Sequence, residues 1–289
     1  MKILLLGSSG FLGIYLNKVL KEKFTVITTG LNKRKNDLTK YVNIKKLIEK
    51  TKPNIIINAS GLTDIEICQS KPNLSEKINI DIIKNIFLIR KKNNFNFEFL
   101  HFSTDHMYNP KNNIKNNELM STSPVNTYTK HKLQAEKICL TNNSLVFRLN
   151  LIGKSRSSKK SFTDWIYEKL KKNDEINGFI DSFYSPLSVE TVAKIIKKII
   201  LKKLLCNSGI FNMGSKDGIS KYNLIVDFSK KLGIYKKNLI KKNKINRMCK
   251  TKRSNYNRLN TNKFEKVFKI HLPFIKSEIN KVTKHYEKI

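Results

Sequence analysis

Tyr128 and Lys132 are four residues apart in a stretch with helical spacing, so their side chains are predicted to share one face of a helix. A tyrosine hydroxyl has a pKa of about 10 and is a poor acid or base at neutral pH. A neighbouring lysine ammonium stabilises the phenolate and lowers the tyrosine pKa, which suits the pair to proton transfer. In a lysine-rich chain the pair alone is weak evidence, because an exposed helix face is the ordinary alternative.

Three polar residues, Ser103, Thr104 and Asp105, follow the apolar run Phe97–Phe102. Such a run is typical of a buried strand, and ligands of open parallel sheets bind at the carboxyl ends of the strands. A hydroxyl at that edge can donate a hydrogen bond to a substrate carbonyl. The combination of this strand end with the Tyr128 pair is more specific than either feature alone.

A glycine-rich turn, Gly7-Ser8-Ser9-Gly10-Phe11-Leu12-Gly13, separates the apolar run Lys2–Leu6 from a stretch with helical spacing. In a dinucleotide-binding turn the first glycine makes the tight bend and the second lets the backbone approach a pyrophosphate. The third lets helix and strand pack closely. The helix N-terminus then offers free N–H groups to phosphates. The residues predicted to bind a dinucleotide here are Gly7, Ser9, Gly10, Phe11, Leu12 and Gly13.

The residues after the second predicted strand bear on which dinucleotide is bound. An acidic residue there would accept a hydrogen bond from the ribose 2′-hydroxyl of NAD, but Thr28–Arg34 contains no carboxylate. Lys33 and Arg34 suit a 2′-phosphate, which favours NADP and leaves NAD as the alternative. In so basic a chain they are equally explained as background charge. Asp37 and Leu38 are predicted to lie beside the adenine edge.

Short apolar runs alternate with stretches of helical spacing through the first half of the chain. The predicted strands are Lys2–Leu6, Phe24–Thr28, Ile55–Ile57, Phe97–Phe102 and Leu145–Arg148. The predicted helices are Phe11–Leu20, Val42–Ile48, Leu74–Arg90 and Asn126–Cys139. Because each parallel connection needs a crossover, the alternation predicts an α/β fold with a Rossmann-type, doubly wound parallel sheet.

After Leu149 the alternation loosens. The pattern there predicts the helices Ser161–Leu170, Val189–Leu204, Ser220–Leu232 and Phe274–Tyr286 and the strand Ile210–Met213. No Pro/Gly/Ser-rich linker separates the halves, so we expect a smaller C-terminal lobe packed on the first domain. The expected domain comprises residues 1–149, with 181–205 packing back on it, and the expected lobe comprises 150–180 and 206–289.

The chain of 289 residues is strongly basic, with 57 Lys and Arg against 22 Asp and Glu and a net charge of +35. Such an excess suggests nucleic-acid binding. Lysine is spread along the whole chain together with Asn and Ile, however, which favours a compositional bias over a selected polyanion site. The densest run, Lys236–Arg253, is expected to form a solvated basic face. A hydrophobic fraction of 39% excludes a wholly disordered basic tail.

The cysteines and the lengths of the apolar runs indicate the cellular compartment that the protein is expected to occupy. The four cysteines are far apart in the sequence, which predicts free thiols in a reducing compartment. No apolar run approaches the roughly 20 residues that span a membrane, and Ile3–Leu6 is too short for a signal peptide. We therefore expect a cytoplasmic protein with no membrane span. No histidine spacing predicts a metal site.

Together these motifs resemble the extended short-chain dehydrogenase/reductase superfamily, and most closely its dTDP-4-dehydrorhamnose reductase family with a sugar-nucleotide-binding lobe. Beyond the glycine turn, the residues that carry the resemblance are Asn58-Ala59-Ser60, Thr63, Glu66, Pro72, Asn79, Phe102-Ser103-Thr104-Asp105, Pro124, Asn126, Tyr128, Lys132, Leu133, Glu136, Arg148, Ser185-Pro186, Ala193, Thr261 and His271-Leu272-Pro273-Phe274. The departures are Gln69, Leu187, Ser254 and Asn260. These departures put the particular sugar in doubt more than the chemistry.

The resemblance implies hydride transfer from NAD(P)H to the keto carbon of a nucleotide-linked 4-keto-sugar, in deoxysugar and surface polysaccharide synthesis. Tyr128 would protonate the developing alkoxide, and Lys132 would lower the Tyr128 pKa and hold the nicotinamide ribose. Thr104, or Ser103 in its place, would polarise the carbonyl. The further implied residues are Asn58, Ala59, Ser60 and Ser103 for the cofactor and Thr63, Asp105 and Arg253 for the sugar nucleotide.

Other functions stay open at this point. A sugar-nucleotide epimerase or dehydratase of the same fold would keep its NAD bound, and a non-catalytic binding or regulatory homologue would not turn over. A nucleic-acid binder would use the net charge, but we expect no specific nucleic-acid partner. The partner expected instead is a nucleotide-sugar substrate, and a homodimer is left open.

Overall fold

The computed structural model describes residues 1–29, 37–108, 110 and 112–287. The chain divides into two compact units. Unit 1 comprises residues 1–103, 126–147 and 193–211, and unit 2 comprises 104–125, 148–192 and 212–289. The expected assignment of residues to a cofactor domain and a substrate lobe stays a prediction.

A six-stranded sheet with the order β10-β5-β4-β3-β1-β2 forms the centre of unit 1. Its strands are β1 (Lys2–Leu6), β2 (Thr25–Thr29), β3 (Ile55–Asn58), β4 (Glu98–Thr104), β5 (Leu145–Leu149) and β10 (Gly209–Asn212). β1 pairs in parallel with β2 on one side and β3 on the other, and β3 pairs in parallel with β4. The strand order therefore reverses beside β1, at the position where open α/β sheets bind ligands. The predicted Rossmann-type sheet is confirmed.

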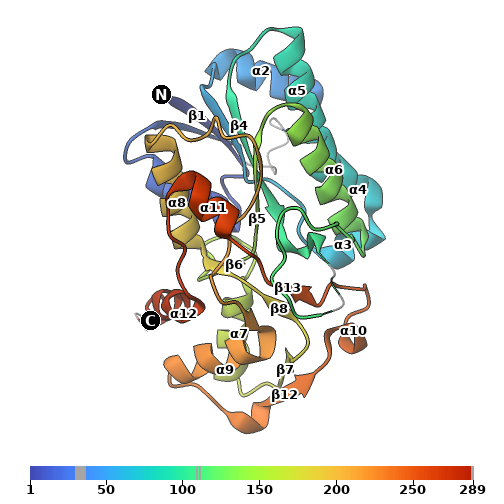
Figure 1. Ribbon diagram of the computed structural model, residues 1–289, viewed down its shortest axis with the longest axis vertical. Coiled ribbons are helices and arrows are strands. Elements are labelled where there is room, and N and C mark those ends of the chain that lie inside the picture. Colours follow the sequence, from blue (N-terminus) through green and yellow to red (C-terminus); the bar gives the residue numbers. More distant parts are fainter. Residues whose placement is uncertain (30–36, 109, 111, 288–289) are drawn as a thin grey trace. The chain divides into compact units, whose positions relative to one another are not determined.

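Helices cover the sheet of unit 1. They include α1 (Phe11–Leu20), α2 (Tyr41–Thr51), α5 (Ile82–Lys92) and α6 (Thr127–Thr141). Helices α2, α5 and α6 lie side by side on one face of the sheet (Figure 1). Buried isoleucines of α2 and α5, with Ala135 and Cys139 of α6, form one apolar cluster with side chains of β1 and β3. Because Ile3–Leu6 and Ile55–Ile57 are buried on both faces, these strands appear in the sequence as continuous apolar runs.

The predicted helix Leu74–Arg90 is only partly correct. The chain there forms α4 (Pro72–Glu76), a π-helical turn η2 (Lys77–Asp81) and then α5. The π turn holds Asn79, whose side chain accepts from the N–H of Leu62 at 3.0 Å and donates to the carbonyl of Leu62 at 3.1 Å. The sequence pattern also missed α3 (Ile65–Ser70), a single short helix capped by Asp64.

Unit 2 is built from short strands and helices around its own core. Its strands are β6 (Leu151–Ile152), β7 (Ile176–Phe179), β8 (Phe183–Tyr184), β9 (Leu187–Ser188), β11 (Ile219–Ser220), β12 (Ile240–Asn243) and β13 (Tyr256–Asn257). Its helices include α7 (Phe162–Lys171), α9 (Lys221–Lys231), α10 (Ile245–Met248), α11 (Asn262–Phe268) and α12 (Ile275–Thr283), while α8 (Val189–Leu201) runs from unit 2 into unit 1. Most of these strands have two residues, too few to show a periodicity of two.

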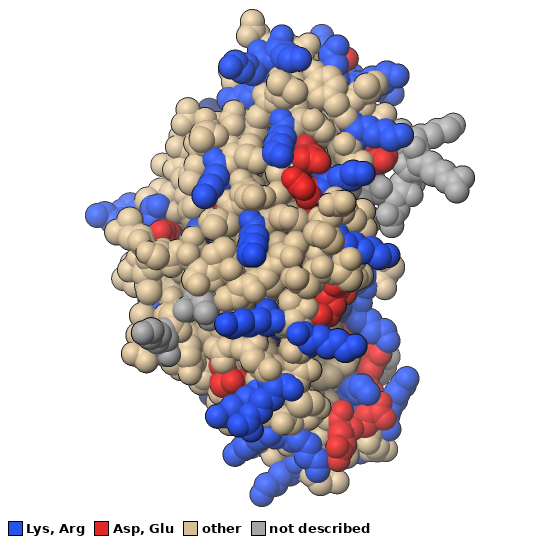
Figure 2. Space-filling model, turned by 90° about the vertical axis from the view of Figure 1, so that its right-hand side faces the viewer, with Lys and Arg blue, Asp and Glu red and all other residues tan. Residues whose placement is uncertain are grey.

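The distribution of charge and the state of the cysteines agree with the sequence, which predicts spread lysines and free thiols. On the face drawn in Figure 2, Lys and Arg side chains are spread over the surface and mixed with Asp and Glu. The lysines of the Lys236–Arg253 run are exposed, as predicted. All four cysteines are free. No helix among the described residues is both long and apolar enough to cross a bilayer.

Candidate functional site

The glycine turn after β1 is packed so closely that its first and third glycines leave no room for a side chain. Gly7 has a positive φ of +75°, and a Cβ there would lie 2.6 Å from the backbone nitrogen of Ser60. A Cβ on Gly13 would lie 2.1 Å from the carbonyl oxygen of Gly7. A Cβ on Gly10 would meet only that same oxygen, at 3.2 Å. The turn thus joins the ends of β1 and β3 to the first turn of α1.

Helix α1 begins at this turn with free backbone donors. Its N-cap residue Gly10 has extended backbone, and no described side chain caps it. The N–H groups of a first helical turn have no intrahelical acceptors and bind anions readily. Ser9 beside them is exposed, Phe11 is half-buried against Tyr15, and Leu12 is buried. This cradle fits the pyrophosphate of a dinucleotide.

The residues predicted to distinguish NADP from NAD are only partly covered. Lys33 and Arg34 lie outside the described residues. Asp37 accepts hydrogen bonds from the N–H and the hydroxyl of Thr39, at 2.9 Å and 2.7 Å, and these bonds lower the pKa of its carboxyl. The side chain of Leu38 is buried in the core of unit 1. Their predicted place beside an adenine ring stays a prediction.

Asn58 ends β3, and Ala59 and Ser60 follow it next to the glycine turn. The side-chain oxygen of Asn58 accepts from the backbone N–H of Ser60 at 3.1 Å and from its hydroxyl at 2.5 Å. The amide nitrogen of Asn58 lies 3.3 Å from Nδ1 of His101 on β4. Thr63, predicted to bind substrate, is exposed in the segment that leads to α3.

Tyr128 and Lys132 lie in the first turns of α6, which begins with a capping box between Asn126 and Thr129. Both residues are buried, at 8% and 5% exposure. The alternative that the pair lies on an exposed helix face is therefore wrong. Tyr128 packs on Ile65 and Cys68 of α3.

The ammonium end of Lys132 is held against β4. Its Nζ donates to the carbonyl oxygen of Phe102 at 2.5 Å and lies 3.0 Å from Nε2 of His101. Burial lowers the pKa of Lys132 to about 8, against the opposing charge of Glu136. A lysine with this pKa can change its protonation state near neutral pH.

Two hydroxyls end β4. Ser103 Oγ is buried and has no hydrogen-bond partner among the described residues. A buried hydroxyl without a partner is costly unless a ligand or water completes it. Thr104, the next residue, accepts from the N–H of His106 at 3.2 Å and donates to a carboxylate oxygen of Asp105 at 3.4 Å.

Asp105 is the centre of a buried polar cluster in unit 2. It has no exposed surface and accepts from the side-chain amide of Asn150 at 3.1 Å. Burial raises the pKa of Asp105 to about 7. Burial also lowers the pKa of Lys221 to about 8, and the charge of Arg253 lowers it further. Arg253, predicted to bind the sugar nucleotide, therefore belongs to the same electrostatic cluster as Asp105.

Asp105→Asn should change how stability depends on pH. A carboxyl whose pKa rises from 3.8 to about 7 on folding binds a proton more tightly in the folded state. Its stabilising contribution is complete below about pH 4 and is lost as pH rises through 7. Between about pH 5 and pH 8, we expect the wild type to lose about 2 kcal/mol relative to the variant.

Urea unfolding of both proteins at several pH values measures this difference. Asp174→Asn, at a partly exposed position, is the matched control and should track the wild type. Parallel stability curves for the wild type and Asp105→Asn would show that Asp105 is ionised throughout.

Three residues that accompany the predicted site residues were not predicted from the sequence: His101, Lys221 and Tyr184. His101 carried one signal, a single polar residue inside an apolar strand. Lys221 is indistinguishable from the many other lysines of the chain, and Tyr184 lies in a strand of two residues. The Tyr184 hydroxyl is buried and has no hydrogen-bond partner in the described part of the chain.

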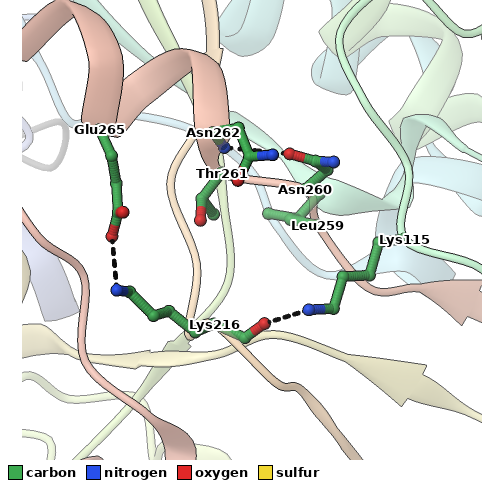
Figure 3. Close-up of a pocket in the computed structure, with 7 residues that line it drawn as sticks. All are labelled: Lys115, Lys216, Leu259, Asn260, Thr261, Asn262 and Glu265. Carbon is green, nitrogen blue, oxygen red and sulfur yellow. Dashed lines mark hydrogen bonds and ion pairs between the residues drawn. The ribbon is translucent and has the colours of Figure 1, made fainter.

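One cavity in unit 2 contains none of the predicted site residues. It has a volume of about 220 Å³ and is lined by Lys115, Lys216, Leu259, Asn260, Thr261, Asn262 and Glu265. Figure 3 shows that Lys216 is held between two of these neighbours. Its ammonium pairs with Glu265 at 3.4 Å, and its carbonyl accepts from Lys115 at 2.6 Å. The charged side chains of this cavity thus already have partners within it.

Comparisons with known proteins identify the family and agree with the fold. The family described as RmlD substrate binding domain matches residues 1–288. A dTDP-4-dehydrorhamnose reductase of Salmonella typhimurium is 24% identical over 94% of both chains.

Two solved structures of that enzyme type share the fold. The protein of Clostridium acetobutylicum has a TM-score of 0.89 and 24% identity, covering 99% of this chain and 100% of its own. The protein of Bacillus anthracis, in complex with NADP, has a TM-score of 0.88 and 17% identity, covering 98% and 99%.

Proposed function

The chain belongs to the RmlD substrate binding domain family, and from this premise we propose that it is an NAD(P)H-dependent reductase of nucleotide-linked 4-keto-sugars. The reaction moves a hydride to the carbonyl carbon and a proton to the carbonyl oxygen. The observation that carries the proposal is the buried Tyr128–Lys132 pair, held against the strand that ends at Ser103 and Thr104. The fold adds the glycine cradle at the reversal of the strand order.

The residues of unit 1 fit the cofactor's parts. The glycine turn and the N-terminus of α1 would hold the pyrophosphate, and Asn58, Ala59 and Ser60 would line the cofactor at the end of β3. When bound, the nicotinamide supplies the hydride. NADP is the preferred form because the relative from Bacillus anthracis was solved with it, and NAD stays the alternative.

Tyr128 acts in this proposal as the acid that protonates the alkoxide. Its ring is held by packing on Ile65 and Cys68 of α3, and the Lys132 ammonium lowers the cost of leaving a phenolate. Thr104 or Ser103 polarises the carbonyl by donating a hydrogen bond. Such acid–base help is worth about 10²–10⁴-fold in rate.

The substrate's anionic part is assigned to unit 2. Arg253 and the neighbouring Lys221 carry two positive charges near Asp105, a carboxyl that is only about half ionised at neutral pH because burial raises its pKa to about 7. That balance favours a diphosphate, which a nucleotide sugar carries. Asp105 and Thr63 would bind its neutral polar groups.

The particular nucleotide and sugar are proposed from the relatives. A dTDP-linked 4-keto-6-deoxy sugar is the first candidate, since the Salmonella relative is named dTDP-4-dehydrorhamnose reductase. The pathway would then be deoxysugar supply for surface polysaccharide. A specific nucleic-acid ligand is not part of the proposal, because lysine is spread along the whole sequence rather than gathered into one segment.

NADPH oxidation against a panel of nucleotide-linked 4-keto-sugars tests the proposal. We expect stoichiometric loss of NADPH absorbance with at least one keto-sugar and much less with NADH. An epimerase or dehydratase would convert sugar nucleotides without net NADPH oxidation. Binding of NADPH and sugar nucleotide with no turnover across the panel would instead indicate a non-catalytic homologue, and the proposed reaction would be wrong.

A further inference from the structure

The side chain of Lys132 ends between two hydrogen-bonding groups of β4. Its Nζ lies 2.5 Å from the carbonyl oxygen of Phe102 and 3.0 Å from Nε2 of His101. A carbonyl oxygen only accepts, so Phe102 takes one N–H of the lysine. The contact with His101 can run in either direction, because a neutral imidazole has one donating and one accepting nitrogen.

The direction is settled at the other ring nitrogen of His101. Nδ1 lies 3.3 Å from the side-chain nitrogen of Asn58. The side-chain oxygen of Asn58 accepts from the backbone N–H of Ser60 at 3.1 Å. A backbone N–H can only donate, so the Asn58 amide cannot be turned round, and its NH₂ group faces His101. Nδ1 of His101 is therefore the acceptor, and the ring proton lies on Nε2.

A doubly protonated ring does not fit this position. His101 is 1% exposed, and burial together with the charge of Lys132 holds the pKa of His101 well below its ordinary value. A neutral ring with its proton on Nε2 needs an acceptor at Lys132. An ammonium has no lone pair, whereas a neutral amine can accept from His101 and still donate to Phe102.

We propose that His101 is a positioning residue that donates from Nε2 to Lys132 and so keeps Lys132 a neutral amine in the cofactor-free protein. The chain of contacts runs from Ser60 through Asn58 and His101 to Lys132. It links the loop beside the glycine cradle to the lysine of the proton-transfer pair. Sequence spacing alone does not connect these residues.

The charges around Lys132 agree with this assignment. Burial is the largest influence and lowers its pKa to about 8. A hydrogen bond donated by His101 favours the neutral amine and lowers that pKa further, which makes the amine the main form at neutral pH. Glu136, one turn further along α6, opposes that shift. Burial raises the pKa of the Cys139 thiol, which leaves it uncharged. Among the described residues, Glu136 is then the one negative group that acts on Lys132.

A consequence follows that rests on the proposed function. With NADPH bound, the ribose oxygens would accept from Lys132 and the phosphates would favour its positive charge. The protein should then take up a proton from solvent, with the Lys132 amine becoming an ammonium. Tyr128 would gain its charged neighbour only in the complex, so the acid would be prepared only when hydride is available.

Nitrogen NMR of the cofactor-free protein with ¹⁵N-labelled histidine tests the tautomer directly. The chain has five histidines, and the His101 signals are assigned by their loss in His101→Phe. We expect a protonated Nε2 and an unprotonated Nδ1 that stay unchanged down to about pH 5. A proton on Nδ1, or protonation of the ring near its ordinary pKa of about 6.5, would overturn the proposal.

Calorimetry of NADPH binding tests the effect on Lys132. Heats measured at about pH 7 in two buffers of different ionisation enthalpy give the protons taken up. We expect a large fraction of one proton for the wild type and none for Lys132→Met. His101→Phe keeps an aromatic ring but removes the N–H that donates to Lys132. Burial alone, with a pKa of about 8, leaves Lys132 mostly charged at pH 7, so the uptake should fall to half or less; an unchanged uptake would contradict the proposal.

The two measurements separate this proposal from the proposed function. If the tautomer is as expected but NADPH neither binds nor is oxidised, the reductase assignment fails and the role of His101 in positioning the proton on Nε2 stands. If NADPH is oxidised with a keto-sugar while the ring proton lies on Nδ1, the reductase assignment stands and the His101 proposal fails.

Discussion

Tyr128→Phe is expected to lower kcat for keto-sugar reduction by about 10³-fold while leaving NADPH affinity nearly unchanged. The substitution removes one oxygen and keeps the ring that packs on Ile65 and Cys68, so the fold should hold. Without the hydroxyl, no group on α6 can protonate the alkoxide. Hydride transfer then proceeds without the proton transfer that stabilises its product. The rate is followed by NADPH absorbance and the affinity by NADPH fluorescence.

Tyr235→Phe is the matched control, because it makes the same chemical change at a partly exposed position in unit 2. It should keep wild-type kinetics. Full activity in Tyr128→Phe would remove Tyr128 from the mechanism. A loss of activity together with a loss of NADPH binding would point to a binding role instead of an acid.

Much of unit 1 could be predicted from the sequence because its strands are buried on both faces and its helices are long. β1 and α1 occur within a residue of their predicted bounds. The helix over Leu74–Arg90 was harder, because the π turn at Asn79 serves a contact with Leu62 that lies far back in the chain. A tertiary hydrogen bond of that kind leaves no periodic signal.

Unit 2 was predicted less well for a physical reason. Its longer helices α7, α9 and α12 carry an apolar stripe, and the sequence pattern predicted them. Strands of two residues, such as β8 and β13, are too short to show alternating apolar and polar residues. What holds them is pairing with each other and with β11, which depends on the folded arrangement of the chain.

Some residues of the candidate site could be predicted from the sequence, and others could not. The glycine turn and the Tyr128–Lys132 pair stand at fixed short spacings, so a linear pattern could indicate them. His101 is 31 residues from Lys132, and Asn150 is 45 residues from Asp105. Contacts at such separations are set by the sheet, and only the folded structure brings them together.

Gly13→Ala and Gly10→Ala should fail in different ways, although both alter the same turn. At Gly13 the new methyl group would lie 2.1 Å from the Gly7 carbonyl oxygen and 2.8 Å from Ser8 Cα, and both are backbone atoms. Backbone cannot move aside cheaply in a packed core, so we expect a loss of about 3 kcal/mol in unfolding free energy. Urea unfolding measures it, and NADPH binding should fall as a consequence.

At Gly10 the new methyl group would meet only the Gly7 carbonyl oxygen at 3.2 Å, which a small shift can relieve, so stability should change by less than about 1 kcal/mol. The methyl group would instead occupy the space through which a pyrophosphate approaches the N-terminus of α1. We therefore expect NADPH affinity to fall at least tenfold in a protein that is otherwise well folded. Normal NADPH binding by Gly10→Ala would place the pyrophosphate elsewhere, whereas equal destabilisation by both substitutions would show that the turn matters for packing alone.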